Sequence, residues 1–108
     1  MVNKRLELHE ILCKIVGITE PDGDRHVYYD PPESVNMKYP AIRYSRSNIK
    51  NKYADNGVYG QKRVYELIVI DRDPDSHIVN SISILPECVY ARGYKASNLN
   101  HDVFYINY

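Results

Sequence analysis

Residues 60–85 read GQKRVYELIVIDRDPDSHIVNSISIL, and they decide the fold because a strand pattern changes there into a helix pattern. β-branched and aromatic side chains occupy both faces at the end of a strand predicted at about residues 60–71, which predicts a central strand. The turn DRDPDS follows, and it predicts a helix start with Asp73 as the N-cap and Pro74 in the first turn. The apolar stripe of this helix consists of Ile78, Val79, Ile82 and Leu85, and Pro86 ends it.

The segments on either side of this stretch complete an α+β pattern. Residues 3–16 predict an amphipathic helix, and residues 26–29 and 39–45 predict two short strands. Residues 88–90 and 102–108 read as strands around a turn-rich segment, ARGYKASNLNH. The element order is therefore α-β-β-β-α-β(β). It predicts a two-layer sandwich, in which two helices pack on a mostly antiparallel sheet of four or five strands.

The composition is that of an ordinary globular protein, with 44% hydrophobic and 26% charged residues, and we expect a single domain over residues 1–108. The longest apolar run, residues 67–70, is too short to span a membrane. The charged start MVNKRLELHE is unlike a signal peptide, so we expect assembly inside the cell. A net charge of zero argues against a dedicated nucleic-acid binder. Tyr outnumbers Phe eleven to one and Trp is absent, which favours half-buried surfaces and interfaces.

Charges are segregated along the chain. Residues 38–63 carry a net charge of +6, residues 20–33 a net charge of −4, and residues 66–75 a net charge of −3. Solvated surfaces account for such runs equally well. The alternative is that basic and acidic patches of one subunit meet their opposites on the next, because head-to-tail contacts of this kind close rings.

A long, polar, basic segment at residues 46–60 is predicted to be a projecting loop before the central strand. Its cations alternate with tyrosines, a combination that can grip single-stranded nucleic acid. An ordinary hairpin loop with Asn56-Gly57 as its turn is the other interpretation. The candidate interface residues in and beside this segment are Arg46, Lys50, Lys52, Tyr53, Tyr59, Lys62 and Arg63.

Motifs for catalysis or metal binding are weak. Asp71, Asp73 and Asp75 alternate like the first ligands of an EF-hand, but Ser76 and Ile82 stand where that loop needs Gly and Glu. The sequence has no G-x-S-x-G, Walker or G-x-G-x-x-G motif. The alternating aspartates are therefore interpreted as a capped helix start.

Histidine and cysteine give no stronger signal. His9 and Cys13 share one helix face at a spacing that can bind a metal, but no second pair completes a tetrahedral site. Cys13 and Cys88 are expected to be small buried hydrophobes without a disulfide, and no local motif supports either as a nucleophile. We expect no enzyme, no catalytic residue, no metal and no cofactor.

The order and content of several blocks resemble small phage tail terminator and tail-completion proteins of the neck, or head–tail connector, group. The resemblance covers residues 39–108 and rests on strand–helix order and on Tyr and Asp patterns. The blocks are YPAIRY at 39–44, NKYADNGVY at 51–59, KRVYELIVIDRDPDS at 62–76 and GYKASNLNHDVFYINY at 93–108.

This resemblance implies a ring, typically a hexamer, that caps the tail tube, ends its polymerisation and offers a docking face to the head-side connector or head-closure protein. Its partners would be copies of itself, the tail tube protein and the genomic DNA that passes through the opening, and its location the virion, after assembly in the host cytoplasm. The 46–60 segment would line the DNA channel or contact a neighbouring subunit. A complementary acidic interface would comprise Asp22, Asp24, Asp71, Asp73 and Asp75. Alternatives are another neck ring (head closure or adaptor) and a small cytosolic nucleic-acid-binding module that uses the basic segment 38–63.

Overall fold

The computed structural model describes residues 4–32, 36–54 and 57–108, and of residues 52–54 and 58–60 the backbone alone. In this part of the chain, two helices and five strands follow one another in the predicted α+β order. They are α1 (Lys4–Val16), β1 (Val27–Tyr29), β2 (Ala41–Ala54), β3 (Gly57–Asp71), α2 (His77–Ser83), β4 (Cys88–Ala96) and β5 (Leu99–Asn107). The fold class predicted from the sequence is confirmed.

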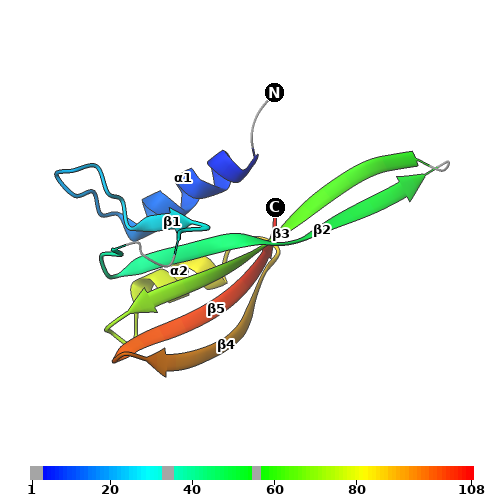
Figure 1. Cartoon of the computed structure of the whole chain (residues 1–108). Coiled ribbons are helices and arrows are strands. Elements are labelled where there is room, and N and C mark those ends of the chain that lie inside the picture. The colour runs from blue at the N-terminus through cyan, green and yellow to red at the C-terminus, as the bar shows by residue number, and fades with distance from the viewer. Residues whose placement is uncertain (1–3, 33–35, 55–56) are drawn as a thin grey trace.

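The strands form one sheet in the order β1-β2-β3-β5-β4 (Figure 1). β1 runs parallel to β2, and all other neighbours are antiparallel. β3 is the middle strand of the sheet, with β2 and β5 as its neighbours, as the apolar run 67–70 predicts.

One face of the sheet carries the core. Alternate residues of the central strands point to this face, and Leu8 and Leu12 of α1 and Ile78 and Ile82 of α2 pack there, all fully buried. The sheet residues of this cluster are Val27, Ile42, Tyr44, Tyr65, Leu67, Val69, Phe104 and Ile106. Both helices therefore lie in one layer, and neither covers the opposite face of the sheet.

Two tyrosines depart from the interface role that the composition suggests. Tyr44 and Tyr65 are only 1% and 3% exposed and belong to the core. The hydroxyl of Tyr44 lies 2.7 Å from Nδ1 of His9 and accepts a hydrogen bond from Nη1 of Arg5 at 3.3 Å. These contacts satisfy a buried phenol, and burial raises its pKa.

The prediction of a loop at residues 46–60 is wrong. β2 continues to Ala54 and β3 begins at Gly57, so the segment is a pair of long strands. The segment has no alternating apolar pattern, because its described side chains are exposed on both faces of the strand pair. The Asn56-Gly57 turn falls largely outside the described residues.

The prediction of a turn-rich segment between the last two strands is also wrong. Residues 88–107 form a hairpin in which only Ser97 and Asn98 lie outside the strands. Both have positive φ, of 52° and 62°, as a two-residue turn with the right-handed twist of a hairpin requires. A Ser-Asn pair is a weaker sequence signal for this turn than Asn-Gly, which explains the error.

The start and end of α2 differ from the prediction as well. Ser76, and not Asp73, is the N-cap, and its Oγ accepts a hydrogen bond from the backbone N–H of Ile78 at 3.3 Å. The helix ends at Ser83, ahead of Pro86, so Leu85 packs on the core from the following turn. Asp71 and Asp73 stabilise the turn before the helix, because each accepts a hydrogen bond from the backbone N–H two residues further along the chain.

Candidate functional site

A two-stranded arm projects from the sheet (Figure 1). β1 pairs with β2 only as far as Tyr44, and β5 pairs with β3 only from Val64 onward. Residues 46–54 of β2 therefore pair only with β3, and residues 57–63 of β3 pair only with β2; we call these two segments the arm. A register shift between Arg46 and Asn48 marks the place where the arm leaves the sheet, as a bulge that increases local twist does.

The arm has no core beneath it. Every described arm side chain is exposed, including Ile49, which is 38% exposed. Across the two strands, Nε2 of Gln61 donates a hydrogen bond to Oδ1 of Asn51 at 2.9 Å. A two-stranded ribbon of this kind is marginally stable in water by itself. The arm is therefore the part of the described chain that most needs further contacts.

The basic residues predicted for this segment lie on the arm. Arg46, Lys50, Lys62 and Arg63 are all exposed. Lys50 and Lys62 are direct cross-strand partners, and like charges in that position repel each other. Lys62 relieves part of this repulsion through an ion pair with Glu87. The arm thus presents positive charge.

The predicted positions Lys52, Tyr53 and Tyr59 belong to the arm strands by their backbones. Their side chains lie outside what the structure describes.

The predicted acidic interface divides into two kinds of residue. Asp24 is structural, because it accepts hydrogen bonds from the hydroxyl of Tyr28 at 2.9 and 3.0 Å and from the backbone N–H of His26 at 2.8 Å. Asp22 is exposed but already pairs with Nζ of Lys38 at 3.1 Å. The backbone N–H of residue 24, followed by this lysine, lowers the pKa of Asp22.

Asp71, Asp73 and Asp75 form the second kind. Their turn follows β3 directly, and the carboxylates of Asp73 and Asp75 are exposed. Among the described residues, none of the three forms an ion pair with a basic side chain. This turn is the acidic surface that remains available to another molecule.

The basic arm and the acidic turn lie at opposite ends of the molecule. β3 runs from Gly57 in the arm to Asp71 at the turn, roughly 46 Å at about 3.3 Å per residue. The molecule is correspondingly elongated, with extents of 51 × 30 × 26 Å. Opposite charges at the two ends suit a head-to-tail contact between copies.

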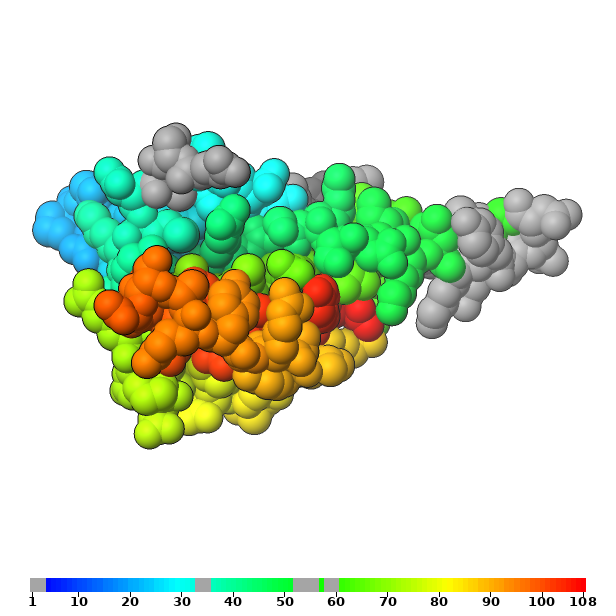
Figure 2. Space-filling view, turned by 60° about the horizontal axis from the view of Figure 1, so that its bottom comes forward, coloured from blue at the N-terminus to red at the C-terminus, as the bar shows by residue number. Residues whose placement is uncertain are grey.

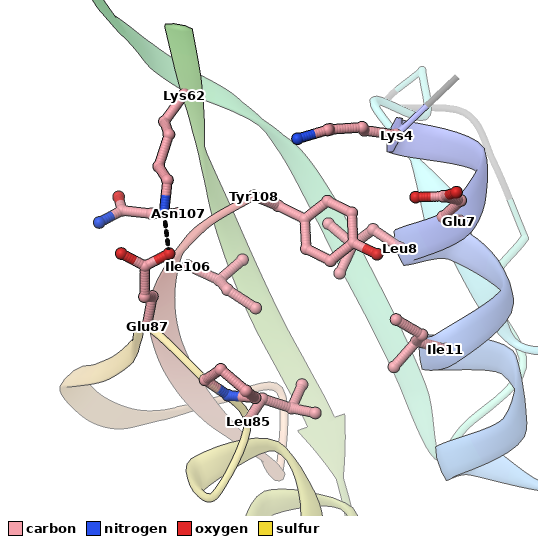
Figure 3. A pocket seen from close by; sticks show the side chains of 11 residues that line it. Lys4, Glu7, Leu8, Ile11, Lys62, Leu85, Glu87, Ile106, Asn107 and Tyr108 are labelled. Atoms are coloured by element: carbon pink, nitrogen blue, oxygen red, sulfur yellow. Dashed lines mark hydrogen bonds and ion pairs between the residues drawn. The ribbon is translucent and has the colours of Figure 1, made fainter. Parts of the chain in front are cut away.

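A groove of about 360 Å³ lies at the base of the arm, between α1, the end of β5 and the segment before β4 (Figure 3). Leu8, Ile11, Leu85 and Ile106 give it an apolar floor. Figure 3 shows the ring of Tyr108 reaching from the end of β5 toward α1. Desolvation, and then the nearby carboxylate of Glu7, raise the pKa of this tyrosine.

The rim of the groove is charged and balanced. It contains Lys4 and Glu7 of α1, with the ion pair of Lys62 and Glu87 on the opposite side (Figure 3). Sequence reasoning missed the groove because its walls come from both chain ends and two internal segments. No local motif joins those segments.

Other polar clusters have structural roles. His26 is 3% exposed, with Nδ1 2.8 Å from the carbonyl oxygen of Pro40 and Nε2 2.8 Å from Oε1 of Glu20. This histidine ties the loop before β1 to the start of β2. Cys13 and Cys88 are unbridged, and burial raises the pKa of both thiols, which makes them poor nucleophiles at neutral pH.

Metal and membrane signals are equally limited. Within the described ranges, no group of three His, Cys, Asp or Glu side chains is placed to hold a metal ion. The helices in this part of the chain are also too short and too polar to cross a membrane.

Comparison with known proteins gives no family assignment. No protein-family model matches the chain, and none of the curated proteins matches it. The candidate site therefore rests on its own geometry: an uncovered basic arm at one end and an acidic turn at the other.

Proposed function

We propose that this protein is a structural component of a phage neck, a ring that caps the tail tube and stops its polymerisation. The ring would also join the tail to the head-side connector or head-closure protein, and genomic DNA would pass through its opening. The sequence resemblance suggests this role and a hexamer. The observation that carries the proposal is the arm, which extends from the body with all its described side chains exposed.

Charge provides the contact between subunits in this proposal. The arm of one copy reaches the turn of Asp71, Asp73 and Asp75 on the next copy. The contact is heterologous, since each copy uses its arm on one side and its turn on the other. Repeating it around an axis closes a ring. Ordering of the arm by a neighbour would also relieve the repulsion between Lys50 and Lys62.

Two alternative functions remain distinguishable. A head-closure or adaptor ring would use the same contacts without affecting tail length. A nucleic-acid-binding module that uses residues 38–63 is supported by the exposed cations of the arm. It is weakened by the pairing of Lys38 with Asp22 and of Lys62 with Glu87, because both cations already have acidic partners within the chain.

A charge-reversal experiment tests the proposal. Lys50→Glu places a negative charge on the arm, and we expect it to weaken assembly. Adding Asp75→Lys to the same chain restores opposite charges and leaves the hydrogen bonds that Asp71 and Asp73 accept in the turn, and we expect it to recover assembly. Each exposed pair contributes about 0.2–1 kcal/mol, which a ring repeats at every interface. Lys14→Glu, an exposed lysine on α1, is the matched control and should assemble normally.

The measurements are particle mass by sedimentation, with and without purified tail tubes, and tail length by negative-stain microscopy. Loss of assembly together with abnormally long tails supports a tail terminator. Loss of assembly with normal tails favours another neck ring. Normal rings and normal tails in the Lys50→Glu variant would reject the role of the arm.

A further inference from the structure

The face of the sheet opposite the helices carries a second surface, which the proposed ring contacts do not use. In-register residues fix its layout: Arg43 pairs with Ile68, Ile68 with Val103, and Val103 with Arg92. All four side chains point away from the helix layer, because they alternate with the core residues along their strands. Two arginines therefore flank an apolar strip on this face.

Aromatic side chains lie on the same face, in the rows on either side of the arginines. Tyr94 of β4 pairs with His101 of β5, and Tyr105 lies four residues further along β5. The rings of Tyr94 and His101 are stacked, with centroids 4.7 Å apart and planes inclined by 12°. Tyr94 belongs to the edge strand and is 44% exposed. We call Arg43, Arg92, Tyr94, His101 and Tyr105 the open-face cluster.

The cluster carries two positive charges and contacts one carboxylate. Arg43 and Arg92 are exposed, and neither forms an ion pair with any described residue. The carboxylate on this face, Glu66, accepts a hydrogen bond from the hydroxyl of Tyr105 at 2.8 Å. A ligand on this face would therefore meet unpaired positive charge beside aromatic rings.

Addition of a further protein strand to β4 is disfavoured by the same residues. Figure 2 shows β4, in orange, at the front of the molecule, and most of its residues are exposed. Its charges, Arg92 and Lys95, and the register shift between Tyr90 and Arg92 are features that protect an edge from strand pairing. A second copy pairing along β4 would also bring these cations together.

We propose that the open-face cluster binds single-stranded nucleic acid, with a base stacked on Tyr94 and with Arg43 and Arg92 in contact with phosphates. Base–aromatic stacking and cations along the backbone are the two interactions that grip single strands. The antiparallel sheet holds both on one rigid surface. This site shares Arg43 with the basic segment 38–63, but its second arginine and its aromatic residues come from β4 and β5. It also does not depend on ring formation.

Fluorescence anisotropy with a labelled single strand of about ten nucleotides tests the site, as DNA and as RNA, at about 50 and 200 mM salt. The wild-type protein should bind, and Tyr94→Ala should weaken binding at least about fivefold. The double variant Arg43→Gln, Arg92→Gln should lower the slope of log K against log salt by about 1.4, or about 0.7 per lost contact. This slope is a second readout should Tyr94→Ala fail to fold.

The matched control is Lys14→Gln, an exposed lysine on the helix layer, which should bind like wild type. Four outcomes overturn the proposal. The first is absence of wild-type binding at the lower salt, and the second is normal binding by the open-face variants. The third is loss of binding in Arg46→Gln, Lys50→Gln, which assigns the nucleic acid to the arm. A change of particle mass in Tyr94→Ala without a change in binding would mean that a second copy occupies the face, and it would also overturn the proposal.

Discussion

Shortening the arm should abolish assembly while leaving the folded domain as stable as wild type. The proposed variant replaces residues 51–61 with Asn-Gly, a two-residue turn that connects the paired positions Lys50 and Lys62. It retains the ion pair between Lys62 and Glu87. What it removes from the described structure is exposed side chains, the strand pairing beyond Lys50 and Lys62, and the hydrogen bonds of Gln61 with Asn51 and Arg63.

The free energy of unfolding should change little, because the removed side chains that the structure describes are exposed. Surface changes away from buried groups usually alter the free energy of unfolding by less than about 0.5 kcal/mol. The reference variant is Leu67→Ala on the middle strand, because Leu67 is fully buried and its truncation should cost about 2–5 kcal/mol. Urea unfolding compares both with wild type, and native mass spectrometry follows assembly. A loss above about 2 kcal/mol in the short-arm variant would refute the reasoning, since the arm would then be part of the domain core.

Three further predictions concern the fold. Gly93→Ala should lower the free energy of unfolding, measured with urea, by about 0.5–1.5 kcal/mol. The added Cβ would lie 2.5 Å from the hydroxyl of Tyr90 and would disrupt the hydrogen bond of this hydroxyl to Asp102. Most of the loss should therefore disappear in a Tyr90→Phe background. Ser76→Ala removes the cap of α2 and should cost about 1 kcal/mol in the same assay. Desolvation lowers the pKa of His9 below 6.5, so the unfolded chain binds the proton of this histidine before the folded chain does, and stability should fall as the pH drops below about 6.5. His9→Gln should reduce this fall in unfolding curves recorded between about pH 5 and 8. An unchanged dependence of stability on pH in this variant would contradict the role of His9.

The sequence predicted the elements that bury apolar side chains. The strand at 60–71 has apolar residues on both faces, and the structure places it in the middle of the sheet. The pattern of residues 3–16 likewise predicted an amphipathic helix, and the structure buries Leu8 and Leu12 on its apolar face. For this helix the periodicity of apolar residues reports which face is covered, so the pattern carries the information directly.

Elements without a buried face could not be recognised in this way. The arm strands have no alternating apolar pattern, because water surrounds the described side chains, and they were interpreted as a loop. The last hairpin was missed for a different reason, since its turn uses Ser97 and Asn98 in left-handed conformations in place of the more familiar Asn-Gly.

The candidate site was predictable in charge but not in geometry. Net charges along the chain identified the basic arm and the acidic turn, and the structure places them at opposite ends of β3. Sequence could not show that Asp24 is held inside its own loop by Tyr28. It also gave no sign of the open-face cluster, whose members meet only through the register of β2, β3, β5 and β4.

Particle mass in solution tests the central claim most directly. Native mass spectrometry of the wild-type chain, alone and with purified tail tubes, should show a closed assembly whose mass is a whole multiple of 12.6 kDa. The short-arm variant should remain at the mass of one chain under both conditions. A wild-type protein that stays a single chain even with tail tubes, or a short-arm variant that still forms the closed assembly, would contradict the account.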